Sequence, residues 1–153
     1  MNNNDVLRRL RYTFRLGDNK MIEIFSHVGS SVTKEQLIGW HKKDDDPDYL
    51  ECSGAKLALF LDGFIIEKRG RIENAPQNND LSINNNIILR KLKIALELQA
   101  EDMLEILKSA EFIISKHELS AFFRRPDHQH YRICNDQLLR RFLKGLRLKY
   151  RVD

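Results

Sequence analysis

The chain has 153 residues, of which 42% are hydrophobic and 31% are charged. This length suits one domain or two very small ones, and the composition allows both a core and a soluble surface. Its 7 glycines and 3 prolines are too few for a sandwich of many short strands, and 2 cysteines are too few for a disulfide-stapled secreted fold.

The excess positive charge lies in the second half of the chain. The net charge is +4; residues 1–76 hold 12 basic and 12 acidic residues, whereas residues 77–153 hold 14 basic and 10 acidic ones. A basic half favours a polyanionic partner, although many ordinary proteins carry such a surplus. The N-terminal residues lack a signal-peptide pattern, and no apolar run approaches the roughly 18 residues of a membrane span. We therefore expect a cytoplasmic protein with no membrane partner and with both thiols reduced.

Apolar residues at helical spacing predict four helices in the first half of the chain. The first should be capped by Asn3 or Asn4 and ended by Gly17, and the second should end before Gly29. Residues Thr33-Lys34-Glu35-Gln36 form a capping box, which marks the start of the third helix. The predicted spans are residues 4–16, residues 18–28, a helix from Thr33, and residues 53–68 with Gly70 behind them.

The sequence repeats itself at an offset of 82 positions. There are 19 identities over the 67 positions 3–69 without a gap, which is strong evidence of duplication. The repeat predicts a second capping box at Ser115–Glu118 and a last helix over residues 135–150, and no segment has the pattern of a strand. We expect an all-α fold of two tandem repeats of about four helices each, packed as a pair of helical bundles. The expected boundaries are a first repeat at 3–70, a linker at 71–84 and a second repeat at 85–152.

Matched positions of the two copies also predict parts of the core. Gly63 and Gly145 lie in the middle of the fourth helix of each copy, where glycine costs about 1 kcal/mol relative to alanine. We expect another backbone to pass close to each of them. Trp40 and its equivalent Phe122 are predicted to be core residues.

Four stretches carry a family resemblance: NNDVLRRLRY at 3–12, KMIEIF at 20–25, KKDDDPDY at 42–49 and EKRG at 67–70. Together they resemble the YehS family, small bacterial proteins of two tandem repeats that are grouped as a domain of unknown function. The resemblance covers nearly the whole chain. It implies a cytoplasmic bacterial protein, and it supplies no established activity and no catalytic residues.

The second and third helices, joined by a turn at Gly29–Val32, match the outline of a DNA-binding helix-turn-helix. The second copy has Glu111–Ile114 in place of that turn, without a glycine, and helix pairs with short turns are common in any bundle. Three positions stay basic in both copies and could hold phosphates. They are Lys34, Lys42 and Lys43 in the first copy and Lys116, Arg124 and Arg125 in the second.

A basic stripe on the last helix is the sharper signal for a polyanion. Four cations at i, i+4, i+7 and i+11 lie within a 60° arc and span about 16 Å. They are Arg140, Lys144, Arg147 and Arg151, and their first-copy equivalents are Ala58, Asp62, Ile65 and Arg69. The shared fold therefore does not require the stripe. The alternative is a solvated face, or one that forms salt bridges to acids such as those of the Asp44–Asp48 loop.

Two other interpretations stay open. Duplicated helical units can bury one face and leave another for a protein partner or a second copy of the chain. The segment Asp127–His130, with Cys134 four residues further on, contains metal-ligand types, although matched cysteines at a helix start are more simply buried apolar residues. Arg8 and Arg90 also agree between copies, either as repeated anion contacts or as partners of Glu23 and Glu105.

The chain has no glycine-rich phosphate cradle, serine elbow or calcium loop, so we expect no catalytic residues, no metal and no cofactor. The interpretation that results is a non-enzymatic cytoplasmic protein that binds DNA or RNA through helix-turn-helix-like units and the basic C-terminal helix. The alternative is a protein–protein interaction or self-association module with no nucleic-acid role.

Overall fold

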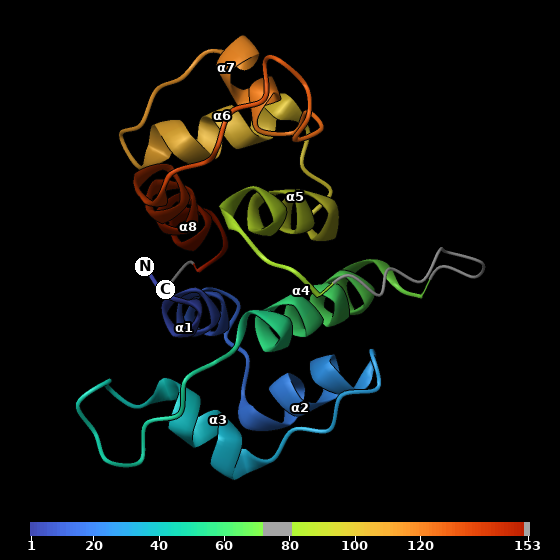
Figure 1. The fold of residues 1–153 in the computed structure, drawn as a ribbon, viewed down its shortest axis with the longest axis vertical. Coiled ribbons are helices and arrows are strands. Elements are labelled where there is room, and N and C mark those ends of the chain that lie inside the picture. The colour runs from blue at the N-terminus through green and yellow to red at the C-terminus, as the bar shows by residue number, and fades with distance from the viewer. Residues whose placement is uncertain (72–80, 152–153) are drawn as a thin grey trace. The chain divides into compact units, whose positions relative to one another are not determined.

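The computed structural model describes residues 1–71 and 81–151, and in these ranges the chain forms eight α-helices and no strand (Figure 1). The chain divides into two compact units, Met1–Ile83 and Asn84–Asp153. Each contains four helices in the same order, so the all-helical class and the tandem repeats are confirmed. The expected linker at 71–84 lies mostly outside the described residues, as does position 152 of the second repeat.

Helix packing follows the same plan in each unit. In the first unit α2 packs along α4, and α1 contacts both α3 and α4; in the second unit α6 packs on α8 and α7, and α5 contacts α8. The first-unit helices are α1 (Asn3–Thr13), α2 (Asp18–Ser26), α3 (Lys34–His41) and α4 (Gly54–Arg69). The second-unit helices are α5 (Asn85–Ala95), α6 (Ala100–Ser109), α7 (Lys116–Ala121) and α8 (Asp136–Tyr150).

The capping boxes that start α3 and α7 are confirmed. The Thr33 hydroxyl accepts a hydrogen bond from the Gln36 N–H, and the Ser115 hydroxyl accepts one from the Glu118 N–H. Each N3 side chain in turn accepts the backbone N–H of its cap residue, so two of the four unpaired N–H groups at the helix start are satisfied.

The first two helices end earlier than predicted. Helix α1 stops at Thr13 because Arg15 adopts a left-handed φ of +53°, and the Leu16 N–H then bonds the Arg11 carbonyl at 3.0 Å. This is the Schellman arrangement, which satisfies carbonyls at a helix C-terminus. Gly17, predicted to end α1, instead precedes α2 as its N-cap.

The second unit ends its helices in the same way without glycine. Gly29, after α2, has φ +73°, and Glu111 takes this place after α6 with φ +62°. The Phe112 N–H bonds the Leu107 carbonyl, as the Ser30 N–H bonds the Phe25 carbonyl. The lack of a glycine in the second copy therefore does not change the geometry of this helix end.

Gly63 and Gly145 allow two helices to cross at short distance, as predicted. A Cβ added at Gly63 would lie 2.9 Å from the carbonyl carbon of Ile24 on α2, inside normal contact distance. A Cβ at Gly145 would lie 2.8 Å from the carbonyl carbon of Ile106 on α6. Only a residue without a side chain lets α4 and α8 pack this closely on their partners.

A buried asparagine in each unit holds the long loop before the last helix. The Asn4 side-chain amide donates to the carbonyls of Trp40 and Leu50, at 3.1 and 2.8 Å, and its oxygen accepts the Cys52 N–H at 2.8 Å. Asn86 forms the same three bonds to Phe122, Arg132 and Cys134. Buried backbone groups without a hydrogen bond cost free energy because water cannot reach them, and the asparagine side chains supply these bonds.

The predicted core residues are buried. Trp40, Phe122, Cys52 and Cys134 all lie inside their units. Burial raises the pKa of Cys52 to about 11 and that of Cys134 to about 12, so both thiols stay protonated near neutral pH. Among the described residues, no helix combines the length and apolar character needed to cross a membrane.

Candidate nucleic-acid interface

The basic face of α8 is the clearest charged feature of the second unit. Arg140, Lys144 and Arg147 are exposed, because Leu139, Phe142, Leu143 and Leu146 occupy the opposite face of the helix and are buried. None of the three cations forms an ion pair with a residue that the structure describes.

The C-terminal end of the stripe differs in character. Arg151 is the C-cap of α8, is half-buried, and donates its backbone N–H to the Arg147 carbonyl. The neighbouring Arg141 is also half-buried and donates its guanidinium to the Ala110 carbonyl at 3.0 Å, which anchors α8 to the end of α6. The solvent-facing part of the stripe is thus Arg140, Lys144 and Arg147, and these three residues are called the α8 basic face below.

The first unit has no equivalent of this face. At the matched positions, Ala58 is fully buried and Ile65 is half-buried. The α8 basic face is therefore an addition of the second copy to a scaffold that both copies share.

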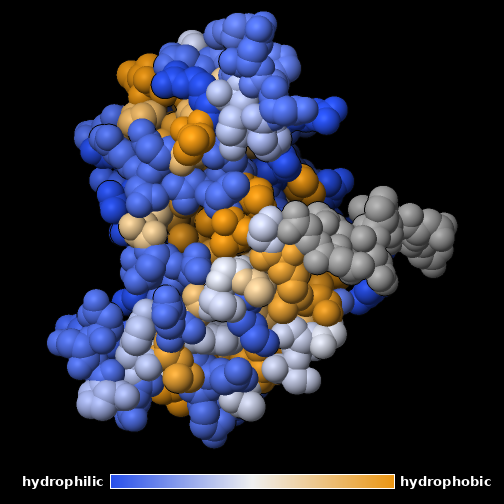
Figure 2. Space-filling view, viewed as in Figure 1, coloured by the Kyte–Doolittle hydropathy of each residue, from blue (hydrophilic) through white to orange (hydrophobic). Residues whose placement is uncertain are grey.

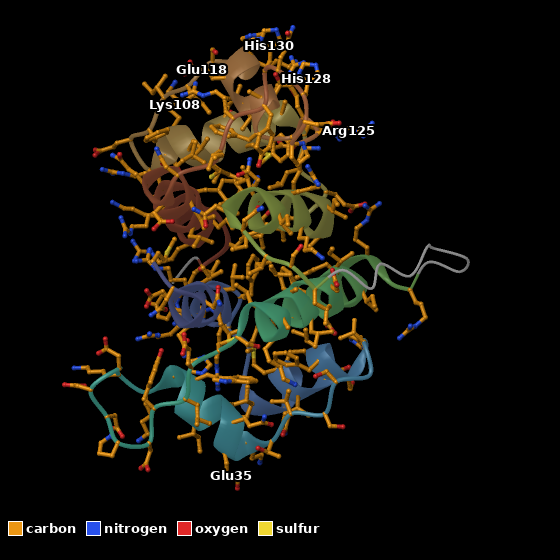
Figure 3. The ribbon with its side chains drawn as sticks, in the orientation of Figure 1. Glu35, Lys108, Glu118, Arg125, His128 and His130 are labelled. Carbon is orange, nitrogen blue, oxygen red and sulfur yellow. The ribbon has the colours of Figure 1, made fainter. Side chains whose placement is uncertain are left out.

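The proposed helix-turn-helix elements are present as helices, but their connections are longer than predicted. Residues 27–33 join α2 to α3, and residues 110–115 join α6 to α7. The DNA-binding motif uses a turn of about three to four residues. The exposed surface of α3 offers Lys34 together with the acidic Glu35 and the apolar Ile38; Figure 3 shows Glu35 projecting away from the unit.

The three matched lysines of the first copy do not gather into one patch. Lys34 is the first residue of α3 and Lys42 is its C-cap, which places them about 12 Å apart along the helix. Lys43 is exposed and lines a surface pocket of about 280 Å³. The other residues that line this pocket are Asn2, Asp5, Arg8, Asp44, Asp45 and Tyr49.

That pocket has mixed charge rather than the character of a phosphate site. Arg8 pairs with Asp5 at 3.2 Å, and the two aspartates of the loop add further negative charge. The alternative that Arg8 pairs with Glu23 does not match the described ion pairs, in which Arg8 pairs with Asp5 and Glu23 pairs with Lys20. Partial loss of solvent, with Glu51 and Asp44 nearby, raises the pKa of Tyr49.

The matched cations of the second copy already have local partners. Lys116 pairs with Glu101 at 2.8 Å, Arg125 lies 3.5 Å from Asp127, and the Arg124 guanidinium contacts the His128 ring at 3.4 Å. Exposed pairs of this kind contribute little to stability and can exchange for other anions.

The loop after α7 does not gather its metal-ligand types into one site. The His128 and His130 rings lie near each other, 5.6 Å between centroids, and both are exposed (Figure 3). Cys134 is buried, and its thiol donates to the Asn135 carbonyl. The raised pKa of Cys134 keeps it protonated, whereas metals bind the thiolate.

Another cluster, in the first unit, was missed by the sequence analysis. Glu23, His27 and Glu67 place one possible ligand atom each within 4.8 Å of one another. The pair Glu23 and His27, four residues apart, is visible in the sequence, but Glu67 joins them only through the packing of α4 on α2. Bonds from His27 and then Lys20 hold the pKa of Glu67 below its usual value, and contacts to Glu23 and Glu67 raise the pKa of Lys20.

Comparison with known proteins places the chain beside relatives without a known activity. A family model described as "Protein of unknown function (DUF1456)" matches residues 3–70 and 85–151. The protein described as "Uncharacterized protein YehS", from Escherichia coli strain K12, is 40% identical over 153 residues, covering 99% of this chain and 98% of that protein. No solved structure matches.

Proposed function

The chain belongs to the DUF1456 family, and the family domain occurs in it twice in tandem. From the difference between the two copies, we propose that the chain binds nucleic acid through the α8 basic face. The observation that carries the proposal is a row of three exposed cations without ion-pair partners among the described residues, at positions where the other copy of the domain has none. The proposal makes the protein a non-enzymatic binding protein of the cytoplasm.

The spacing of the α8 basic face suits a phosphate backbone. Along the helix axis, Arg140 and Lys144 are about 6 Å apart, and Lys144 and Arg147 about 4.5 Å. Successive phosphates of one strand advance about 3.4 Å along a duplex, and long flexible side chains can adjust to that interval. Because α8 is a continuous helix packed on α5 and α6, these cations are held on one rigid support.

The face predicts affinity without strong sequence preference. Contacts of lysine and arginine to phosphates position a protein but do not read bases. Three phosphate contacts give a slope of about −2.7 in a plot of log K against log salt for duplex DNA. Raising the salt from about 50 to 200 mM should then weaken binding by about 40-fold.

Fluorescence anisotropy with labelled duplex DNA and single-stranded RNA of mixed sequence tests the proposal. The triple variant R140E/K144E/R147E should lose the binding seen with the wild-type chain. The matched control is K34E/K42E/K43E, which changes the net charge by the same amount in the first unit. It should retain affinity within about threefold, because the first-unit lysines are not gathered into one face.

The outcomes separate the two possible modes of binding. Loss of binding in the first-unit variant alone would transfer the function to the helix-turn-helix-like elements. The absence of binding by the wild-type chain even at low salt would remove the nucleic-acid proposal.

One observation favours a second candidate, a protein–protein contact through the second unit. Ile113 and Ile133, on the loops that flank α7, are 81% and 78% exposed, while their first-copy equivalents are Ser31 and Glu51. Figure 2 shows hydrophobic side chains among hydrophilic ones around α6 and α7. If this surface binds a second copy, sedimentation should show a concentration-dependent dimer that the variant I113S/I133E abolishes.

A further inference from the structure

We propose that Glu23, His27 and Glu67 form a binding site for a divalent transition metal of the Zn²⁺ class in the first unit. One ligand atom from each residue lies within 4.8 Å of the others, and the donors are one imidazole nitrogen and two carboxylate oxygens. These are ligand types that Zn²⁺ accepts, at distances of about 2.0 to 2.2 Å. Nothing in this proposal depends on nucleic-acid binding by the second unit.

Two helices already hold the donors close to a coordinating arrangement. The His27 Nε2 atom lies 2.9 Å from a Glu67 oxygen, although the residues are 40 positions apart in the chain. Ligands around a tetrahedral metal at about 2.1 Å are roughly 3.4 Å from one another. Side-chain movements of little more than 1 Å would therefore let all three donor atoms coordinate one ion, with a fourth position left for water.

The backbone beneath the cluster is fixed by the glycine crossing. Gly63 lets α4 approach Ile24 of α2, and the cluster lies about one turn beyond this point: His27, the C-cap of α2, follows Ile24 by three residues, and Glu67 on α4 follows Gly63 by four. His27 is held further by the Arg71 guanidinium, which donates to its backbone carbonyl at 2.8 Å. Glu23 and Glu67 lie on packed helices and His27 at the end of one, and such supports keep the geometry of a site better than a loop does.

The second copy shows that the fold does not need these residues. It makes the same crossing between Gly145 and Ile106, but Ser109 stands in the place of His27 and Lys149 in the place of Glu67. Glu105 is the one ligand type retained. The cluster is therefore a specialisation of the first copy rather than a requirement of helix packing.

Lys20 occupies the place of the cation when no metal is bound. Its ammonium lies 2.9 Å from Glu23 and 3.1 Å from Glu67, so it pairs with both carboxylates and offsets part of their negative charge. A divalent ion would have to displace this ammonium group. Removing Lys20 should therefore strengthen metal binding, whereas a purely structural ion-pair network would show no metal binding to strengthen.

Titration of the full-length chain with Co²⁺ and with Zn²⁺ near neutral pH tests the site. Cobalt reports coordination through its visible absorption, and calorimetry with Zn²⁺ measures affinity. The wild-type chain should bind one ion in this unit. Substitutions H27A and E67Q should each weaken binding at least about 100-fold, since even outer-shell partners of metal ligands are worth 10- to 100-fold. The substitution K20M should increase the affinity.

The matched control is H128N/H130N, which removes the exposed histidines of the second unit and should leave the bound ion in place. A circular dichroism spectrum like that of the wild-type chain shows that H27A and E67Q are folded. If H27A is not folded, E67Q alone tests the site. Binding that survives E67Q but disappears in H128N/H130N would assign the metal to the other loop and overturn the proposal, as would the absence of binding by the wild-type chain.

Discussion

Replacing Gly63 by alanine separates two physical effects that act in opposite directions. In an isolated helix the change should stabilise by about 1 kcal/mol, because glycine has the larger loss of backbone entropy. In the folded unit the new methyl group would lie 2.9 Å from the carbonyl carbon of Ile24 and 3.0 Å from its Cγ2 atom. Normal contact between carbon atoms is about 3.5 Å or more, so α2 must retreat by at least about 0.6 Å.

That movement has a cost because α2 supplies three fully buried side chains, Met21, Ile24 and Phe25. Overpacking of a core costs about 1 to 3 kcal/mol, and a backbone carbonyl cannot rotate away as a side chain could. With a cost near the upper value and the gain of about 1 kcal/mol from helix propensity, we expect G63A to lose about 2 kcal/mol.

Urea unfolding followed by tryptophan fluorescence measures this loss in the correct unit. Trp40 is the one tryptophan of the chain, is buried, and packs against Phe25 of α2 with the rings tilted and their centroids 5.7 Å apart. With a urea slope of about 1 to 3 kcal/mol per M, the midpoint should fall by about 1 M. An unchanged or higher midpoint would refute the close helix crossing. The substitution K144A on the exposed face of α8 is the control and should change stability by less than about 0.5 kcal/mol.

Three further results are expected. The substitution N4A should destabilise the first unit by at least about 3 kcal/mol, because three buried backbone groups lose their partner; a loss below about 1 kcal/mol in urea unfolding would contradict this. The substitution E111G should stabilise the second unit by about 1 kcal/mol in thermal unfolding, since glycine adopts φ +62° without steric cost, and a lower melting temperature would count against it. Cys52 and Cys134, with pKa values raised by burial to about 11 and about 12, should react with iodoacetamide far more slowly in the native chain than in urea; equal rates would show that they are accessible.

The duplication made much of the fold predictable from the sequence. Because two copies of one domain must bury the same positions, agreement between them marked Gly63 with Gly145 and Trp40 with Phe122 as parts of the scaffold. The caps of α3 and α7 were predictable because a capping box is a local motif that needs only four residues. The end of α1 was predicted three residues too late, because a left-handed residue such as Arg15 has no reliable signature when it is not glycine. The end of α2 was predicted two residues too late, although Gly29 follows this helix.

Of the candidate sites, too, one was predictable from the sequence and another depended on the packed structure. The α8 basic face was visible beforehand, because cations at helical spacing share a face whatever the helix packs against. The sequence did not show that the first-copy lysines lie at both ends of α3 and beside a mixed-charge pocket. Their placement depends on the shape of the loop that Asn4 holds.

Local patterns thus specified the helices, their repeat and the charged face, since each depends on residues within a few turns of one another. Asn4 as the anchor of a distant loop, and Glu67 beside His27, became apparent only from the packed structure. The reason is that such contacts join residues about 40 positions apart, and local sequence patterns do not specify which distant residues meet. For His27 and Glu67, the contact depends on the close crossing of α2 and α4 at Gly63.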